Sequence, residues 1–276
     1  MSHRETMLPA LPPPPGAMRR TSLSHYIGIV ALGFWLAASV GIFLFIVQSW
    51  SLEKLAKYGP NFISGLGVTL TLVSISIVLG GILSLPIAYG RMSKNKILSW
   101  IAYIYVYFFR GTPLITQLFL VYYGFGSFRP YLEAIGLWTF FRDAWFCALL
   151  TFTLNTAAYQ AEILRGAIES VPRGQHEGAA ALGLHKRIAF FKIILPQAMI
   201  VALRPYGNEI ILMIKGSAIV AIVTVFDLMG ETRRAFSRTY DFQMYLWAAI
   251  LYLIMVEMLR NLWAWIELRL TRHLKR

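Results

Sequence analysis

Three ionisable residues lie inside long apolar stretches of the sequence. Arg110 lies within residues 97–123, and Glu209 and Lys215 lie within residues 205–226. An ionised side chain inside a membrane segment costs about 2.5–3.5 kcal/mol on insertion scales, so it needs a functional or structural reason. A carboxylate there attracts a cationic group of a ligand, and a guanidinium or ammonium group attracts an anionic one. The alternative for each residue is a structural ion pair with another helix or with a neighbouring subunit.

Glu209 and Lys215 do not provide that ion pair for each other. They are six residues apart, which places them about 240° from each other around a straight α-helix of 3.6 residues per turn. Each therefore needs a partner on another segment, water in a cavity, or a ligand. Gly216 and Ser217 follow Lys215, and a break in the helix there would free backbone groups to line a cavity.

The sequence lacks the spaced residues that common catalytic and cofactor sites require. It contains no G-x-x-x-x-G-K-[ST] phosphate loop, no H-E-x-x-H metal motif and no G-x-S-x-G nucleophile elbow. Cys147 is the single cysteine, which excludes an intrachain disulfide and a cysteine-based metal cluster. The five histidines are not paired within an apolar stretch. We therefore predict no catalytic residue, no metal ligand and no cofactor bound by this chain itself.

Residues 162–204 separate two apolar stretches and are too polar to form a clean membrane span. Pro172 is expected to end a helix there, and the small, Ala-rich residues 175–182 are expected to form a short helix that ends at Gly183. An amphipathic segment from Ile188 to Leu195 follows, and Pro196 is expected to interrupt it. A short helix of small residues can be approached closely by the cleft of a partner protein. The loop at residues 162–196 therefore predicts mechanical docking rather than catalysis.

The elements that position these residues are six apolar segments. The chain is 57% hydrophobic, has a mean hydropathy of +0.59 and contains only 14% charged residues, against roughly a quarter in soluble domains. About 20 apolar residues cross a bilayer as a helix. The six predicted spans are residues 26–48, 62–90, 97–123, 144–161, 205–226 and 243–266. The predicted fold is therefore all-α, that of a polytopic helical membrane protein.

Lysine and arginine residues indicate the orientation of these spans. If the proline-rich tail of residues 1–25 is cytoplasmic, 15 Lys and Arg residues lie on the cytoplasmic side and 7 lie on the other side. This bias favours six spans with both termini in the cytoplasm. The net charge of +13 does not favour nucleic-acid binding, because the basic residues form short clusters beside apolar stretches, where they face anionic lipid.

The loop at residues 162–196 also carries a spaced pattern. It contains Glu177-Gly178-Ala179, then Gly183, then Ile193, then Leu195-Pro196. This pattern resembles the signature loop of ATP-binding-cassette (ABC) importer permeases: E-A-A, three residues, G, nine residues, I, one residue, L-P. Gly178 departs from it, since the family usually has Ala there, and Gly is less favourable than Ala in a helix by about 1 kcal/mol or slightly less. The resemblance implies that these residues form a coupling helix and its support, which bind in a groove of an ATPase subunit.

Other segments are similar to the polar amino acid branch of that family, over about residues 58–272. They are Arg110-Gly111-Thr112-Pro113, Asn155-Thr156-Ala157-Ala158-Tyr159, Val171-Pro172-Arg173-Gly174-Gln175 and Asn208-Glu209-Ile210-Ile211-Leu212. Within the branch the chain resembles permeases for histidine, lysine, arginine, ornithine and opines. The resemblance implies a five-helix importer core in residues 58–272 and an additional N-terminal helix at 26–48. It also adds Asn155 to the substrate-path candidates Arg110, Glu209 and Lys215.

The same resemblance implies the partners. They are an ABC ATPase dimer that binds ATP and Mg²⁺, a second permease subunit that is a related but different chain, a periplasmic substrate-binding protein, an amino acid substrate and membrane lipid. The chain would be a non-catalytic subunit that crosses a bacterial inner membrane several times. ATP binding would bring the two ATPases together, and their motion would pass through Glu177–Gly183 to spans that reorient by alternating access.

Two interpretations from other classes stay open. An ion-gradient-driven secondary amino acid transporter would be active as this one chain without an ATPase, and it would be expected to show an internal repeat. A membrane scaffold without transport activity would leave the spaced loop and the intramembrane charges without a purpose.

Overall fold

The computed structural model describes residues 23–49 and 51–272, and the regular elements within these ranges are all helical. The chain divides into two compact units, Met1–Trp50 and Ser51–Arg276. The predicted tail at residues 1–25 lies outside the described residues except for its last three, and residues 273–276 lie outside them too. The predicted cytoplasmic position of both termini therefore stays a prediction.

Helix α1, Leu23–Ser49, forms the described part of the first unit. Its described apolar side chains are exposed on all sides, among them Ile27, Trp35 and Phe43. At 1.5 Å per residue its 27 residues extend about 40 Å, more than the roughly 30 Å of hydrocarbon in a bilayer. A helix that is apolar all round and long enough to cross is typical of a membrane span, as the sequence predicts for residues 26–48.

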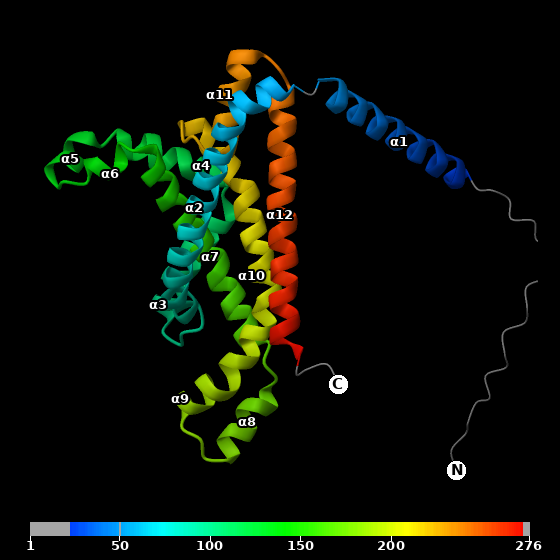
Figure 1. Cartoon of the computed structure of the whole chain (residues 1–276). Helices are drawn as coiled ribbons and strands as arrows, with labels where there is room; N and C mark the ends of the chain where they lie inside the picture. Colours follow the sequence, from blue (N-terminus) through cyan, green and yellow to red (C-terminus); the bar gives the residue numbers. More distant parts are fainter. Residues whose placement is uncertain (1–22, 50, 273–276) are drawn as a thin grey trace, which may run out of the picture. The chain divides into compact units, whose positions relative to one another are not determined.

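The second unit contains the other helices (Figure 1). Its elements are α2 Leu52–Arg91, α3 Lys96–Gly111, α4 Leu114–Phe119, the π-helix η1 Leu120–Gly124, α5 Arg129–Ala134, α6 Trp138–Phe141, α7 Ala144–Glu169, α8 Arg173–Ala181, α9 Lys186–Ala189, the π-helix η2 Phe190–Ile194, α10 Leu195–Ser217, the 3₁₀-helix η3 Ala218–Val223, α11 Leu228–Thr239 and α12 Gln243–Leu270.

Four long helices of this unit are connected by packing. α2 packs against α7, α7 against α10, and α10 against α12. Their shared core is apolar and includes Leu72, Phe152, Met213 and Trp247. The short helices α8 and α9 lie at one end of the long helices, and α11 lies at the opposite end (Figure 1). The two ends can therefore carry different functions.

Small residues let α2 and α7 approach closely. A Cβ atom added to Gly80 would lie 2.4 Å from Thr156 Cγ2, and one added to Gly81 would lie 3.1 Å from Gln160 Oε1. The Gln160 Nε2 also donates to the Ile77 carbonyl at 3.0 Å, which connects the two helices by a hydrogen bond. Membrane helices associate through such close packing and interhelical hydrogen bonds, because lipid is as apolar as their side chains.

The predicted spans agree with the helices only in part. By length and composition, four helical segments suffice to cross a membrane: Leu23–Phe45, Leu52–Arg91, Lys186–Val223 and Gln243–Leu270. A fifth arises if α3 and the segment Leu114–Gly124 count as one span, although they are bent by 107°. The span predicted at 97–123 is thus not one continuous helix but two helices joined at a bend. Proline disfavours helical backbone at the residue before it, and Pro113 accordingly leaves Thr112 extended between the two helices.

Helix α7 covers the span predicted at 144–161 but is absent from those candidates. It continues to Glu169 and includes Asn155, Gln160, Glu162 and Arg165, which lower its hydropathy. Most of its residues up to Ala161 are buried by neighbouring helices. The polar residues of α7 are thus typical of a helix that faces other helices. The prediction of six spans, in contrast, treats each apolar stretch as facing lipid.

The charged residues Asp227, Glu231, Arg233 and Arg234 lead one to expect a solvated outer loop from the sequence, but the segment is the helix α11 with Asp227 at its start. Asp227 is fully buried and accepts a hydrogen bond from the Gly230 amide at 2.8 Å, which starts α11. The Leu228 amide donates to Thr69 Oγ1 at 3.1 Å on α2. Glu231 is also buried, whereas Arg233 and Arg234 are exposed. The expectation is wrong because Asp227 caps the start of a helix and because α11 buries one of its faces against α2.

Candidate functional site

The short helix α8 has the geometry of an exposed docking element. It runs Arg173–Ala181, follows Pro172, and ends where Gly183 adopts a left-handed φ of 65°. The Gly183 amide donates to the Ala180 carbonyl at 2.9 Å and the Leu184 amide donates to the Ala179 carbonyl at 3.1 Å. This pair of bonds is the Schellman arrangement that glycine favours after a helix. The predicted helix and its stop at Gly183 are confirmed.

The predicted docking residues divide between an exposed face and a buried base. Glu177, Gly178 and Gly183 are exposed, and Leu182 beside them is 78% exposed. Ala179 is buried, and Ile193 and Leu195 are half-buried. A partner can therefore reach the first group, whereas the second group attaches the helix to the rest of the unit.

That attachment consists of a small apolar cluster and one polar contact. Ile194 packs with Ala167, Val171 and Ala198, so that the ends of α7 and α10 enclose the start of the loop. Gln197 Nε2 on α10 lies 3.3 Å from Gln175 Oε1 on α8 and donates to it. A helix held at its base can transmit a push to α7 and α10.

The sequence predicts that Pro196 interrupts the amphipathic segment that precedes it, but the helix continues through this residue. The helical segment runs from Lys186 to Val223. The Leu195 amide donates to the Phe190 carbonyl five residues earlier, in the π-helix η2. Pro196 then lies in the first turn of α10, where a missing N–H is tolerated. A π turn is rare and marks functional positions in many helices.

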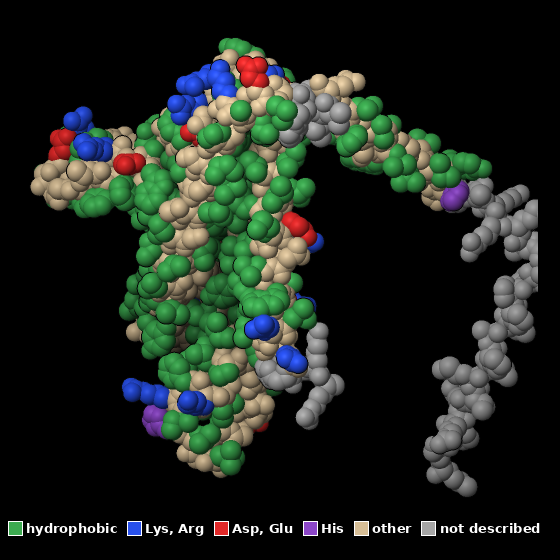
Figure 2. All heavy atoms as spheres, in the orientation of Figure 1, with side chains coloured by type: hydrophobic (Ala, Val, Ile, Leu, Met, Phe, Trp, Pro, Cys, Tyr) green, Lys and Arg blue, Asp and Glu red, His purple; other side chains and the backbone are tan. Residues whose placement is uncertain are grey.

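Basic side chains surround the docking helix. Lys186, Arg187 and Lys192 are exposed, and Figure 2 shows Lys, Arg and His side chains gathered at the end of the unit where α8 and α9 lie. Exposed cations favour contact with an acidic surface or with anionic lipid.

A second group of polar residues lies between the long helices, around Glu209. Glu209 is 5% exposed and accepts a hydrogen bond from Thr156 Oγ1 at 2.9 Å. Thr156 in turn accepts from Gln160 Nε2 at 3.1 Å. Among residues 23–49 and 51–272, no Lys or Arg nitrogen lies within 4.0 Å of Glu209. A buried carboxylate with this environment can attract a cationic group.

Asn155 fixes the bend between α3 and α4. Its Nδ2 donates to the Phe109 carbonyl at 3.0 Å and to Gln117 Oε1 at 2.9 Å. Gln117 Nε2 donates to the Phe109 carbonyl at 2.9 Å and to Thr112 Oγ1 at 2.8 Å. The backbone freed by the bend at Pro113 is thereby satisfied. Gln117, which the sequence analysis does not single out, is the second member of this support.

Arg110 forms a structural ion pair with another helix, which is the alternative that the sequence leaves open for it. Its Nη1 lies 3.6 Å from Glu162 Oε2. Arg91 Nε lies 2.9 Å from Glu162 Oε1, and Arg165 Nη2 lies 2.9 Å from Glu162 Oε2. Arg165 also pairs with Glu169. The helical spacing of residues 162, 165 and 169 signals only the pairs within α7; the arginines of α2 and α3 come from tertiary packing.

Lys215 lies apart from both groups. It is exposed near the end of α10, and no ion pair involves it within the part of the chain that the structure describes. The helix changes from α to 3₁₀ after Ser217 and continues to Val223, so the break expected at residues 216–217 is not present. Arg110, Asn155 and Glu209 thus lie on helices that pack together, whereas Lys215 points away from that core.

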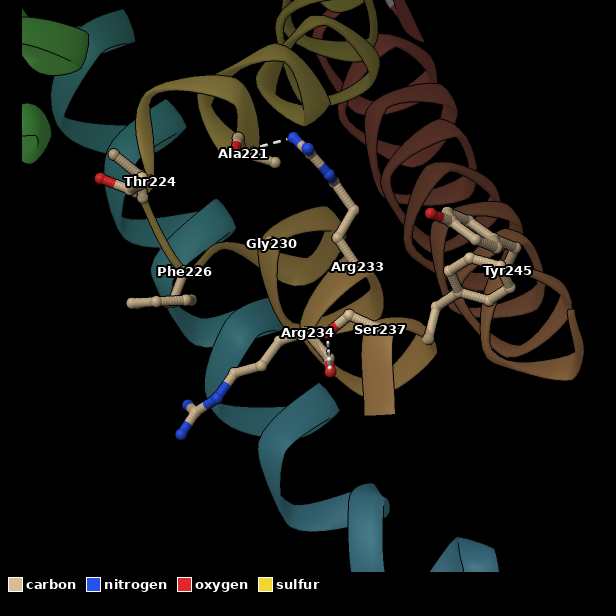
Figure 3. A pocket seen from close by; sticks show the side chains of 10 residues that line it. Ala221, Thr224, Phe226, Gly230, Arg233, Arg234, Ser237 and Tyr245 are labelled. Atoms are coloured by element: carbon tan, nitrogen blue, oxygen red, sulfur yellow. Dashed lines mark hydrogen bonds between the residues drawn. The ribbon is translucent and has the colours of Figure 1, made fainter. Parts of the chain in front are cut away.

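The opposite end of the unit carries a cavity of about 520 Å³ formed by α11, the connection before it and the start of α12 (Figure 3). Arg233 Nη1 donates to the Ala221 carbonyl at 3.1 Å. Arg234 Nη1 lies 3.3 Å from Glu231 Oε1, and its guanidinium lies 5.3 Å from the centre of the Phe226 ring. Figure 3 shows the two arginines pointing in different directions. Both are engaged by this chain.

Comparison with known proteins places these features in a family context. The family described as "Binding-protein-dependent transport system inner membrane component" matches residues 76–272. The nopaline transport system permease protein NocM of Agrobacterium fabrum is 41% identical over 217 residues, which cover 78% of this chain and 90% of that protein. The histidine/lysine/arginine/ornithine transport system permease protein HisM of Escherichia coli K12 is 40% identical over 213 residues, which cover 77% and 90%.

Solved structures agree with the fold. A chain of an amino acid ABC transporter crystallised with histidines has a TM-score of 0.71 and 35% identity, and the match covers 80% of this chain and 99% of that one. A chain of the MetNI methionine ABC transporter in an inward-facing conformation has a TM-score of 0.65 at 19% identity, which supports the fold alone.

Proposed function

This chain belongs to the family of binding-protein-dependent transport system inner membrane components, and from that premise we propose that it carries cationic amino acids or opines. It is a multi-pass, non-catalytic permease subunit of an ABC importer, which works with an ATPase and a binding protein. The relatives' names specify nopaline, octopine, and histidine with lysine, arginine and ornithine. These solutes share a carboxylate and a basic nitrogen, so a path for them needs both an acidic and a basic contact.

The observation that carries this proposal is the buried carboxylate of Glu209. It lies between helices, hydrogen-bonded by Thr156 and without an ion-pair partner among the described residues. In our proposal Glu209 attracts the basic group of the solute, and Arg110 binds its carboxylate. Asn155 positions the bend that carries Arg110. Lys215, exposed at the end of α10, contributes positive charge where the solute enters or where a second permease lies.

We propose six spans for the chain, the five of the importer core and α1. Five of these spans are the candidates named above, and the sixth span is α7, whose 26 residues extend about 39 Å. Polar residues are tolerated in a span that other helices bury. Both termini and α8 then lie on the cytoplasmic side of a bacterial inner membrane, as the Lys and Arg distribution favours, and α11 lies on the periplasmic side.

The energy of transport enters through α8 in this proposal. Glu177, Gly178 and Gly183 present the exposed surface for a groove of the ATPase. Ala179, Ile193 and Leu195 are buried or half-buried and support it, and the exposed Pro196 lies in the first turn of α10. ATP and Mg²⁺ bind to the ATPase dimer. A second permease subunit, related to this chain but different from it, completes the path, and the periplasmic binding protein delivers the solute. The movement of α8 reaches the path through α7 and α10.

The decisive measurement is uptake of arginine, histidine and a neutral amino acid by the complete transporter with Glu209→Gln. Loss of the buried charge is expected to lower uptake of cationic arginine by about 10-fold more than uptake of the neutral solute, a difference of about 1.4 kcal/mol. Glu257→Gln is the control, because Glu257 is a half-exposed carboxylate on α12 that pairs with Arg260. An equal loss for both solutes would show that Glu209 has a structural role instead.

Reconstitution distinguishes the alternative of a secondary transporter. The chain alone in vesicles with a proton or sodium gradient is expected to give no uptake, whereas the complex with ATPase and ATP is expected to transport. Gradient-driven uptake by the single chain would overturn the proposal.

A further inference from the structure

Glu162 is bound by more arginines than one carboxylate requires. Arg91 from α2 and Arg165 from α7 each approach it to 2.9 Å, and Arg165 Nε adds a second hydrogen bond at 3.1 Å. Arg110 from α3 stays at 3.6 Å, beyond hydrogen-bonding distance. Glu162 would therefore keep its hydrogen bonds if Arg110 left it.

The charges around Glu162 do not balance. Within 4.0 Å, three guanidinium groups face two carboxylates, those of Glu162 and Glu169, and the buried Glu209 carboxylate interacts with Arg110 only at longer range. Arg110 is the most accessible of the three arginines, with 44% of its side chain exposed against 17% for Arg91 and 27% for Arg165. The guanidinium of Arg110, the most loosely paired and most exposed of the three, is thus the one that an anion can reach.

Arg110 also lies where a solute can reach it. It lines two open cavities, of about 390 and 360 Å³, that share Arg110, Tyr159 and Glu162. These volumes lie within the range of small-molecule sites, about 300–1,000 Å³. The Arg110 guanidinium lies 5.3 Å from the centre of the Tyr159 ring. An aromatic face holds the plane of a guanidinium and leaves its N–H edge for a carboxylate.

The backbone that carries Arg110 is held in place while its side chain is not. The Phe109 carbonyl, one residue earlier, accepts hydrogen bonds from both Asn155 and Gln117. Arg110 itself has the long contact with Glu162, the Tyr159 ring and a longer-range electrostatic interaction with Glu209, but no ion pair shorter than 3.6 Å among the described residues. A fixed helix end with a loosely held guanidinium can exchange one carboxylate for another without refolding.

We propose that Arg110 is an exchangeable carboxylate site, at which the α-carboxylate of the transported solute displaces Glu162. The inference rests on the proposed function, because it assigns the solute a carboxylate. Arg91 and Arg165 retain Glu162, so the exchange breaks the Arg110–Glu162 pair between α3 and α7 without leaving a bare charge, while Asn155 still holds the end of α3 against α7. The bidentate pair between Arg110 and the solute carboxylate replaces the weak pair between Arg110 and Glu162. The solute is therefore bound, but it can leave again when Glu162 takes back its place. Helix α7, which carries Glu162, leads directly to α8.

The exchange predicts opposite changes in solute affinity for variants of Arg110 and of Glu162. In the complete transporter, reconstituted in nanodiscs without the binding protein, equilibrium binding of radiolabelled L-arginine is measured. Arg110→Gln is expected to weaken binding at least 10-fold, whereas Glu162→Gln is expected to strengthen it several-fold because the competing carboxylate is gone. L-argininamide, which lacks the carboxylate, is expected to compete at least 10-fold less well than L-arginine. Arg110→Lys keeps the charge without the bidentate geometry and should fall between the unaltered protein and Arg110→Gln.

Arg129→Gln serves as the control, because it removes an exposed arginine that pairs with Glu133 on α5. If Glu162→Gln weakens binding as Arg110→Gln does, or if neither changes it, the pair is structural and the inference is overturned. Equal competition by L-argininamide, or no binding of L-arginine to the unaltered transporter, would overturn it as well. Misfolding cannot produce the strengthened binding of the Glu162 variant. Failure of the proposed function would appear separately, as absence of ATP-driven uptake of cationic amino acids and opines.

Discussion

Replacement of Gly183 offers a direct test of the docking helix. Gly183 has a φ of 65° and closes the Schellman arrangement after α8. A Cβ atom added there meets no atom within 4 Å. Gly183→Ala therefore introduces no clash, and its whole effect is the cost of a left-handed backbone for a residue with a side chain.

That cost is about 1 kcal/mol or somewhat more. It corresponds to about a fivefold fall in the ratio between molecules in which the turn after α8 is formed and molecules in which its hydrogen bonds are broken. Gly183→Asn should cost less, because asparagine tolerates this conformation. Gly178→Ala is the matched opposite change, since position 178 is also open within 4 Å and lies inside α8, where alanine is favoured over glycine by up to about 1 kcal/mol.

Two measurements on the reconstituted transporter report the effect. Hydrogen exchange of the Leu184 amide, which donates to the Ala179 carbonyl, should quicken about fivefold in Gly183→Ala and less in Gly183→Asn. Amino acid uptake per ATP hydrolysed should fall in the same order, and a bulky residue such as valine should uncouple hydrolysis from uptake. Gly178→Ala should keep or improve both values.

Unchanged uptake per ATP in Gly183→Val, in protein that inserts normally, would refute the assignment of α8 as the coupling element. Quicker exchange without any loss of coupling would refute the link between the glycine turn and transport while leaving the backbone argument intact.

Other predictions concern stability, measured as thermal unfolding in detergent. Gly65→Ala would place a Cβ 2.7 Å from the Asp227 carbonyl oxygen and should destabilise by about 1–3 kcal/mol, whereas Gly67→Ala, with no atom within 4 Å, should be neutral; equal effects would contradict this packing. Burial raises the pKa of Asp227 to about 6 from 3.8, so the folded state favours its protonated form and stability should fall as pH rises from about 4 to 6, by roughly 3 kcal/mol at most. Asp227→Asn, which retains an acceptor for Gly230, should remove that slope; a variant that keeps it would identify another titrating group.

Features encoded by a few neighbouring residues could be predicted from the sequence. As expected, α7 ends shortly before Pro172 and α8 ends at Gly183, because proline and a left-handed glycine act within one turn of the chain. The pattern from Glu177 to Pro196 likewise led to the family that the comparisons show. The apolar lengths also suffice to predict an all-helical membrane chain.

Features that depend on distant packing could not be predicted in this way. The 107° bend after α3 is stabilised by Asn155, more than 40 residues further along, as well as by Pro113. Pro196 continues a helix because a π turn precedes it, which no residue preference specifies. Glu162 and its three arginines come from α2, α3 and α7, so their meeting follows only from the arrangement of the helices.

The glycine contacts of α2 also set an order for biogenesis. Gly80 packs against Thr156, which lies 76 residues further along the chain, and Gly65 packs against Asp227, which lies 162 residues further along. At synthesis rates of about 5–20 residues per second, these partners emerge roughly 4–15 s and 8–32 s after the glycines. During that interval α2 must wait in the bilayer with lipid or an insertion factor against both positions. The nascent chain is therefore most open to misassembly before α7 arrives, and a factor that shields small residues of a half-made membrane protein would act at that moment.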